Sequence, residues 1–251
     1  MAIKKNDFSS LKKKFSTSAK YKPQRYLDLG KDFLDAVGLP GPAIGHLNMF
    51  LGHSDTGKTT ALVKAAVDAQ KKGILPVFII TEQKWNWDHA ELMGFDREND
   101  YLFNSDFEYI EQITDFINEV LDAQEKGEIP HDLLFLWDSI GSIPCKMSIE
   151  ANKNNPMWNA GAMSQQFGNF VNQRITLSRK TSQPYTNTLV AINKVWVAKP
   201  DNPMGQPTMN NKGGNTMYFD ASLIVTFGNI AKAGTNKIKA TKNGKEIEFA
   251  K

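Results

Sequence analysis

The sequence LGHSDTGKTT at residues 51–60 contains two glycines, Gly52 and Gly57, in the spacing G-x-x-x-x-G-K-[ST]. This spacing is typical of a phosphate-binding loop, because glycines let backbone N–H groups curl around phosphates and the following helix directs its positive end toward them. An apolar run precedes the motif and a helical pattern follows it, which is the context that such a loop requires. The residues expected to bind a nucleotide here are Gly52, His53, Ser54, Asp55, Thr56, Gly57, Lys58, Thr59 and Thr60.

Apolar runs typical of β-strands alternate with helical patterns from residue 46 onward. The runs are almost continuously hydrophobic, which indicates strands covered by helices on both faces. The sequence therefore predicts an α/β fold, with a mostly parallel twisted sheet flanked by helices. The expected strands are HLNMFL (46–51), PVFIIT (76–81), LLFLWD (133–138), TLVAIN (188–193) and SLIVTF (222–227).

Three helices are expected between these strands. The first covers residues 59–73 and ends on a glycine cap, Gly73. The second places Ile110, Ile113, Ile117 and Leu121 on one face. Ser105 and Glu108 fit a capping box before it. The third covers about 163–178.

Two acidic residues follow apolar runs on the expected carboxyl edge of the sheet. Asp138 ends LLFLWD, and Glu82 follows VFIIT. Because ligands of open α/β sheets bind at this edge, Asp138 is expected to hold Mg²⁺ together with Thr59, and Glu82 to position the attacking water. The alternatives are a strand-end cap for Asp138 and a surface position for Glu82.

The composition, with 41% hydrophobic and 23% charged residues, is that of a globular protein. No run of about eighteen apolar residues exists, and the N-terminus has no apolar segment of the secretory kind, so a cytoplasmic protein is expected. The single cysteine, Cys145, excludes an internal disulfide and is expected to pack as a small hydrophobic residue.

The net charge of +3 is concentrated in a basic segment near the N-terminus. Residues 1–30 are therefore interpreted as a basic arm, which either touches phosphates or is solvated, and residues 31–251 as the core. Phe8, Leu11 and Phe15 predict a short amphipathic helix in the arm, which docks on its own core or on a neighbouring copy.

Two stretches rich in Asn, Pro and Gly interrupt the alternating pattern, at residues 150–162 and 195–215. Loops of this length inside a compact domain are usually functional or disordered.

The order of these parts resembles the RecA family of homologous recombinases, and most closely its phage members of the UvsX type. The resemblance extends from about residue 48 to residue 227. The segments that carry it are GHSDTGKTT, FIITEQKWNWDHAELMGFD, LWDSIGSIPCKMSIE, MSQQFGNFVNQ, VAINK and GGNTMYFDAS.

The resemblance implies ATP and Mg²⁺ as ligands, with Glu82 activating water and Asn193 sensing the γ-phosphate. Lys194 occupies the position that links ATP to the second DNA-binding loop in the family. It can reach the γ-phosphate as a cation, but it cannot accept a hydrogen bond. His89 matches the residue that stacks on adenine, although tryptophans lie near it in the sequence.

The resemblance also assigns the two long stretches to DNA binding and the N-terminal helix to polymerisation. Aromatic and apolar side chains beside cations suit sequence-independent stacking of bases, but either Trp can instead belong to the core or to an interface. The expected DNA-binding residues are Met157, Trp158, Trp196, Lys199, Lys212, Gly213, Gly214 and Asn215. Lys239 and Lys242 resemble lysines that reach the neighbour's ATP; the alternative is a solvated hairpin edge. The C-terminal domain of bacterial RecA is expected to be absent.

The expected protein is a DNA-dependent ATPase that forms helical filaments on single-stranded DNA and exchanges strands with double-stranded DNA. Loading or single-strand-binding proteins are possible further partners, and no membrane is expected. Two alternatives stay open from the sequence: a hexameric helicase-like ATPase, since fold does not dictate function, and a regulatory filament that binds nucleotide but no DNA.

Overall fold

The computed structural model describes residues 5–16, 20–153, 155–198, 208–211, 216–228, 237–242 and 245–250. Side chains are described for residues 9–12, 14–16, 20–153, 155–195 and 216–228.

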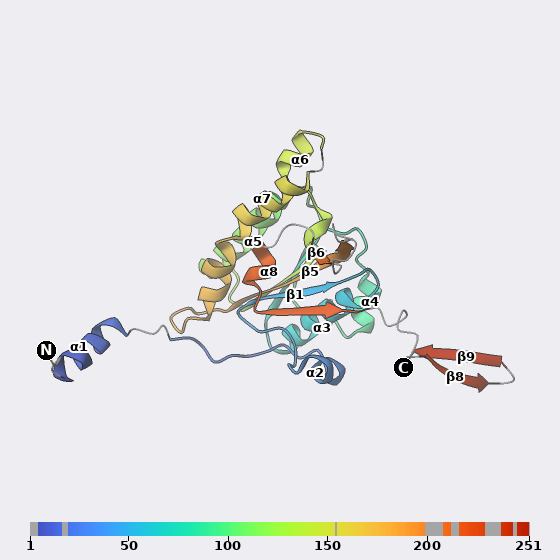
Figure 1. Ribbon diagram of the computed structural model, residues 1–251, viewed down its shortest axis with the longest axis horizontal. Helices are drawn as coiled ribbons and strands as arrows, with labels where there is room; N and C mark the ends of the chain where they lie inside the picture. The colour runs from blue at the N-terminus through green and yellow to red at the C-terminus, as the bar shows by residue number, and fades with distance from the viewer. Residues whose placement is uncertain are drawn as a thin grey trace.

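A parallel β-sheet forms the centre of the molecule (Figure 1). Six strands follow one another in the order β3-β2-β4-β5-β1-β7, and every neighbouring pair along this path is parallel. A short strand, β6, pairs with β5 in the antiparallel sense. The strands are β1 (Leu47–Gly52), β2 (Leu75–Ile80), β3 (Leu102–Asn104), β4 (Leu133–Asp138), β5 (Asn187–Ala198), β6 (Thr208–Asn211) and β7 (Leu223–Phe227).

Helices cover both faces of this sheet (Figure 1). Successive residues of a strand point to opposite faces, so Met49 packs into one core and Phe50 into the other. The first core lies under α5, α7 and α8, and the second lies under α3 and α4. The helices are α1 (Lys5–Phe15), α2 (Lys31–Val37), α3 (Lys58–Lys71), α4 (Trp87–Leu92), α5 (Ile110–Glu125), α6 (Lys146–Glu150), α7 (Pro156–Phe167) and α8 (Thr216–Asp220).

The predicted α/β fold with a mostly parallel sheet is confirmed, and so are its five expected strands. The glycine cap is confirmed as well: Gly73 has a φ of 68° and donates its N–H to the carbonyl of Gln70 at 3.1 Å. The expected face of α5 is buried at Ile110, Ile113 and Ile117. The hydrophobic pattern was thus sufficient for these strands and for the buried face of α5.

The predicted capping box before α5 is wrong. The helix begins at Ile110, so Ser105 and Glu108 both lie ahead of it. The side chain of Gln112 reaches back instead and accepts the backbone N–H of Glu108 at 2.7 Å. The predicted cap, Ser105, lies four residues ahead of the observed cap, Tyr109, because the spacing of the motif does not show where the helix starts.

The prediction of one helix over residues 163–178 is also wrong. Helix α7 ends at Phe167, and the chain continues through a π-helical turn, η2 (Val171–Ile175), and a 3₁₀ turn, η3 (Thr176–Arg179). Phe167, Phe170 and Val171 all belong to the first core, whereas the apolar Leu177 is 36% exposed.

Parts of both expected loops are regular structure within the described residues. Helix α7 begins at Pro156, inside the first stretch, and the side chain of Asn155 caps it by accepting the N–H of Met157 at 3.0 Å. In the second stretch, β5 runs on to Ala198 and pairs with β6. A composition rich in Asn and Pro indicated a loop here, but the same residues are common at helix N-termini.

The helix expected in the basic arm is present as α1. Leu11 is 46% exposed and Phe15 is 74% exposed, so neither side chain docks on the chain's own core. Cys145 is buried, as expected for a packing residue, and its Sγ lies 3.4 Å from Ser148 Oγ. Within the described residues, no helix has both the length and the apolar character needed to span a bilayer.

Beyond the sheet, β8 (Lys237–Lys242) and β9 (Lys245–Ala250) form an antiparallel hairpin.

Candidate functional site

The expected phosphate-binding loop connects β1 to α3 at the carboxyl edge of the sheet. Gly52 and Gly57 have φ values of 154° and 92°, in the region that favours glycine. A Cβ atom on Gly52 would lie 2.6 Å from the carbonyl oxygen of Phe227, so no larger residue fits there. The backbone geometry is therefore that of a tight loop ahead of a helix N-terminus, which suits an anionic ligand.

Lys58 is the first residue of α3 and is buried, with 6% of its surface exposed. Its ammonium group donates to the carbonyl of His53 and so lies inside the loop. Burial lowers the pKa of Lys58 and the charge of Lys194 lowers it further, whereas Asp138 and Glu82 act in the opposite direction. A buried cation held mainly by a carbonyl is well prepared to bind a phosphate.

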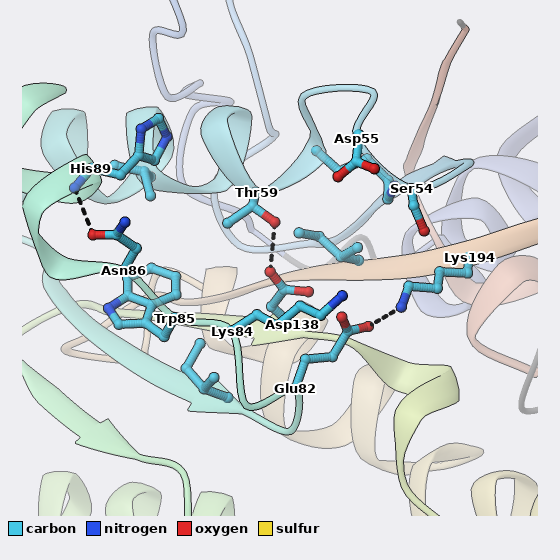
Figure 2. Close-up of a pocket in the computed structure, with 14 residues that line it drawn as sticks. Ser54, Asp55, Thr59, Glu82, Lys84, Trp85, Asn86, His89, Asp138 and Lys194 are labelled. Atoms are coloured by element: carbon cyan, nitrogen blue, oxygen red, sulfur yellow. Dashed lines mark hydrogen bonds and ion pairs between the residues drawn. The ribbon is translucent and has the colours of Figure 1, made fainter.

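Thr59 and Asp138 face each other across the cavity, as Figure 2 shows. The hydroxyl of Thr59 donates to Asp138 Oδ2 at 2.8 Å. Burial raises the pKa of Asp138, although the Thr59 hydrogen bond and the charges of Lys58 and Lys194 oppose this change. The peptide bond between Asp138 and Ser139 is cis.

Glu82 lies just beyond β2, close to the end of β4. Its Oε1 accepts the Ser139 hydroxyl at 2.6 Å and lies 2.8 Å from Lys194 Nζ. Burial raises the pKa of Glu82, but the hydrogen bonds from Lys194 and Ser139 and the positive charge of Lys194 outweigh it, so the pKa lies below its ordinary value. Glu82 is therefore an ionised carboxylate with fixed partners. It does not occupy the exposed surface position that was the alternative interpretation.

Asn193 and Lys194 belong to β5, which continues past them to Ala198. The sequence had placed Asn193 at the end of its strand. Asn193 is 1% exposed, and Lys194 is paired in register with Gly52, the last residue of β1. Lys194 thus stands beside the beginning of the phosphate-binding loop.

A cavity of about 420 Å³ is lined by Lys58, Thr59, Glu82, Asp138 and Lys194, among other residues (Figure 2). The side chain of His89 forms part of the wall, and its Nε2 lies 3.3 Å from Thr60 Oγ1. Asn86, which caps α4 by accepting the N–H of His89 at 3.1 Å, and Trp85 also line the cavity. The cavity is lined by Ser54, Asp55, Lys58, Thr59, Val63, Ile80, Glu82, Lys84, Trp85, Asn86, His89, Asp138, Ile192 and Lys194.

Sequence reasoning missed Lys84, Trp85 and Asn86 as parts of this wall, and it missed Ser139 as a hydrogen-bond donor to Glu82. Ser139 directly follows Asp138 in the sequence, and a hydroxyl at that position was the available signal. The positions of Lys84 and Asn86 depend on the turn between β2 and α4, whose path the sequence pattern does not specify.

The residues of the site fit a nucleotide triphosphate with a divalent cation. In the described part of the chain, no group of three or more His, Cys, Asp or Glu side chains is arranged to hold a metal ion. A Mg²⁺ ion would therefore be held by the Thr59 hydroxyl and the Asp138 carboxylate together with oxygens of its ligand and water, which is how proteins commonly bind this ion. The loop geometry and Lys58 supply the matching phosphate site.

Of the residues expected to contact DNA, only Met157 and Trp158 have described side chains. Both lie in the first turn of α7, where Met157 is 82% exposed. Trp158 is half-buried and packs against the first core, so part of its side chain serves the core, as the alternative interpretation stated. The backbone of Trp196 lies in β5.

The remaining expected residues cannot be placed in the site. Lys199, Lys212, Gly213, Gly214 and Asn215 lie outside the described residues. The backbones of Lys239 and Lys242 lie in β8, opposite Glu248 and Lys245 of β9, and their side chains are not among those described.

No protein-family model matches the chain. Among curated proteins, it is similar to Protein RecA of Sulfurovum sp. (strain NBC37-1), with 25% identity over 221 residues, 87% of this chain and 59% of that protein. Protein RecA of Francisella philomiragia is 29% identical over 216 residues, 85% of this chain and 54% of that protein. Protein RecA of Wolinella succinogenes is 25% identical over 234 residues, 88% of this chain and 62% of that protein.

The chain thus spans less than two thirds of the length of these relatives. The chain is homologous to RecA proteins at about 25% identity over most of its length.

Proposed function

We propose that the chain binds and hydrolyses ATP with Mg²⁺ at the carboxyl edge of its sheet. The observation that carries this proposal is the pairing of Thr59 with Asp138 at 2.8 Å, beside a glycine-rich loop that contains the buried Lys58. In this function Lys58 binds the terminal phosphates, and Thr59 and Asp138 hold the cation. His89 and the residues around it would surround the base.

Glu82 would position the water that attacks the γ-phosphate. Its carboxylate is ionised and its orientation is fixed by Ser139, as a group that aligns a nucleophile requires. Asn193 would sense the γ-phosphate from within β5. The cation supplies charge neutralisation on the phosphate oxygens when it is bound.

We propose further that hydrolysis serves homologous pairing of DNA. The similarity to RecA proteins supports this step. In this proposal the chain polymerises on single-stranded DNA when ATP is bound, tests it against a duplex, exchanges strands and leaves after hydrolysis. The expected DNA-binding residues are those of the α7 and β5–β6 regions named above.

Assembly into a helical filament is part of the same proposal. Residues 1–30 would form a basic arm whose helix α1 packs on a neighbouring core, in agreement with the exposure of Leu11 and Phe15 in the single chain. Lys239 and Lys242 would reach the neighbour's ATP. The sequence motifs alone support kinship with the phage UvsX type, and the cytoplasm is the proposed location because ATP and single-stranded DNA occur together there.

The proposed function is tested by measuring ATP hydrolysis with and without single-stranded DNA. We expect DNA to stimulate hydrolysis, and we expect Glu82→Gln to lower the stimulated rate by about 10²- to 10⁴-fold, the range for loss of a general base. Binding of ATP and DNA should remain. Glu128→Gln, which changes an exposed glutamate after α5, is the matched control and should hydrolyse normally.

Strand exchange between a circular single strand and a homologous linear duplex then tests the recombinase step. We expect joint molecules only when ATP is present. DNA-stimulated hydrolysis without joint molecules would support a helicase-like motor instead, and ATP binding without any DNA stimulation would support a regulatory filament.

A further inference from the structure

The side chain of Thr81 connects β2 to β4 beyond the point where their backbone pairing ends. The parallel register of these strands ends at Ile80 and Asp138. The backbone N–H of Thr81 still donates to the carbonyl of Asp138 at 2.8 Å. From there the Thr81 hydroxyl takes the place of a backbone group: its Oγ1 accepts the N–H of Ser139 at 3.0 Å and lies 2.8 Å from the carbonyl oxygen of Ser139. One hydroxyl therefore contacts both backbone polar groups of the residue that follows Asp138.

Two further groups fix the Thr81 hydroxyl itself. The indole N–H of Trp137 donates to it at 3.4 Å, and Ser142 Oγ lies 2.6 Å from it. Trp137 is fully buried and packs against Phe167 in the first core. Ser142 also lies 2.6 Å from the carbonyl oxygen of Ser139. A hydroxyl has one hydrogen and two lone pairs, so every donor has an acceptor when Thr81 donates to Ser142 and Ser142 donates to Ser139.

The two carboxylates of the proposed ATP site are the chain neighbours of this contact. Glu82 follows Thr81, and Asp138 precedes Ser139. The Ser139 hydroxyl donates to Glu82 Oε1 at 2.6 Å. This bond closes a ring that runs from Glu82 to Thr81 along the backbone, across to Ser139, and back through the Ser139 side chain. Both carboxylates line the same cavity (Figure 2). A shift of one strand end relative to the other must therefore break a hydrogen bond of the ring.

The relative position of the two carboxylates matters for hydrolysis in the proposed function. Asp138 would help to hold the cation and with it the phosphates, whereas Glu82 would align the attacking water. Attack tolerates little error, since a displacement of about 1 Å can cost about a hundredfold in rate. The backbone N–H of Glu82 reaches the carbonyl of Asp138 only at 3.3 Å. Side-chain contacts must therefore supply much of the accuracy.

We propose that Thr81 is a positioning residue for ATP hydrolysis: its hydroxyl holds Ser139, and through Ser139 it sets the place of the Glu82 carboxylate relative to Asp138. Thr81, unlike the two carboxylates, is not one of the residues that line the cavity, so it acts through its neighbours and not on the nucleotide. The inference rests on the proposed function and deepens it, since it names the side chain that keeps the water-positioning group and the cation-binding group in register.

Thr81→Val tests this role, because valine keeps the branched shape and removes the hydroxyl. The DNA-stimulated kcat for ATP should fall about tenfold to a hundredfold, the range for residues that orient a group of the site. The KM for ATP and the calorimetric affinity for a non-hydrolysable ATP analogue should both stay within about threefold of wild type, because the phosphate-binding loop is unchanged. Thr81→Ser, which keeps the hydroxyl, should restore kcat to within about threefold.

A double-mutant cycle separates positioning from a general loss of packing. If Thr81 acts through Ser139, the kcat of Thr81→Val combined with Ser139→Ala should stay within about twofold of that of the less active single variant. Losses from independent effects would multiply. Ser142→Ala gives a second test at an exposed position, and it should lower kcat by about threefold with the affinity for the analogue unchanged.

Thr181→Val is the matched control, because Thr181 is exposed and its hydroxyl also donates to a backbone carbonyl, that of Lys20, at 3.3 Å. It should hydrolyse ATP at the wild-type rate. Urea unfolding shows whether each variant is folded under the conditions of the assay.

A wild-type kcat in Thr81→Val, a loss of analogue affinity as large as the loss of kcat, multiplied losses in the double variant, or an equal loss in Thr181→Val would each overturn the positioning role while leaving the ATP site intact. If Thr81→Val does not fold, an unchanged kcat in Ser142→Ala would overturn it. Failure of the wild-type chain to hydrolyse ATP would instead refute the proposed function, and the positioning role with it.

Discussion

The two edges of the parallel sheet use polar residues in different ways. At the carboxyl edge, Lys58, Lys194, Glu82 and Asp138 gather around a cavity of about 420 Å³. At the amino edge, polar residues are bonded to one another or to the backbone. Asn48, fully buried near the start of β1, donates to the carbonyls of Ala43 and His46 and accepts the N–H of Ala43.

The amino edge continues this pattern across the sheet. Gln124 of α5 and Asn187 of β5 exchange two hydrogen bonds, at 2.9 and 3.1 Å, and both are buried. Asp132 accepts the N–H of Thr186 at 2.8 Å and pairs with Arg25 at 3.0 Å. These side chains connect the segment before β1 with the starts of β4 and β5.

The comparison separates residues that stabilise the fold from residues that serve a ligand. Neutral amides at the amino edge form hydrogen bonds with buried backbone groups. Burying such groups costs little folding free energy when every hydrogen bond is made, and much more when one partner is removed. Charged groups at the carboxyl edge are buried against a desolvation cost, as the lowered pKa of Lys58 and the raised pKa of Asp138 show. A protein retains such charges where a ligand will use them.

Among the substitutions in this comparison, the largest effect on hydrolysis is expected for Lys58→Met, which tests whether the charged residues of the carboxyl edge serve a ligand. The substitution removes the charge and keeps most of the apolar stem, so hydrolysis of ATP should fall by about 10²-fold or more, as for the loss of one preorganised donor to a reacting centre. The free energy of unfolding should change by less than about 1 kcal/mol, because the lost bond to His53 is offset by relief from burying the charge. Steady-state hydrolysis and urea unfolding measure the two effects.

Lys64→Met, on the partly exposed face of the same helix, provides the control for α3. It should leave both hydrolysis and unfolding unchanged. If Lys58→Met unfolded the protein as readily as a core substitution, Lys58 would be structural and the contrast between the edges would be lost.

The opposite result is expected for Asn48→Ala at the amino edge. The substitution leaves the buried N–H and C=O of Ala43 without their partner, so the free energy of unfolding should fall by about 2–4 kcal/mol. Binding of nucleotide to the folded fraction should stay within about twofold of wild type, because Asn48 lies at the far end of β1 from the phosphate loop. Urea unfolding and calorimetry measure these quantities.

Asn99→Ala is the control for this substitution, because Asn99 is exposed and its side chain accepts the N–H of the next residue, Asp100. Its effect on unfolding should be within about 0.5 kcal/mol. A comparable loss of stability in both variants would show that the buried position of Asn48 is not what matters.

The same contrast explains how much of the structure the sequence could predict. The strands were predictable because each is covered on both faces and so reads as a continuous apolar run, as in LLFLWD. Glu82 and Asp138 were placed correctly at the carboxyl edge because their distance from the strand ends determines their position in a parallel sheet.

The regions that were predicted wrongly depend on contacts between distant segments. Asn155 and Pro156 were taken as loop residues although they begin α7, because helix and loop share these residue types. In the structure, Asn159 of α7 accepts the N–H of Cys145 and the hydroxyl of Ser148, each at 2.9 Å. The ion pair of Lys194 with Glu82 was not predictable either, since the two residues are far apart in sequence and meet only through the order of strands.

The smallest expected effect concerns His46, which joins three elements at the amino edge. Its Nδ1 lies 2.8 Å from Ser222 Oγ, and its Nε2 lies 3.0 Å from Gln24 Oε1 and contacts the Arg179 guanidinium. Burial lowers the pKa of His46 from its ordinary value of 6.5, and the charge of Arg179 lowers it further. The folded chain therefore favours the neutral ring.

The sign of the resulting pH dependence follows from this direction. Below pH 6.5 the unfolded chain binds a proton at His46 that the folded chain does not, so stability is complete above this pH and is lost as the pH falls. One such proton changes the free energy of unfolding by at most about 1.4 kcal/mol per pH unit. Urea unfolding of the wild type and His46→Gln between pH 7.5 and about 5 measures the difference, which isolates this residue from the carboxylates.

His131→Gln, which changes an exposed histidine, is the matched control and should follow the wild-type curve. The stability of His46→Gln relative to the wild type should rise toward low pH, even if the variant is weaker at pH 7.5. If the stabilities of the wild type and His46→Gln changed in parallel with pH, His46 would take up its proton equally in the folded and the unfolded chain. The amino edge would then tolerate a buried charge as the carboxyl edge does, and the distinction between the two edges would depend on the ligand alone.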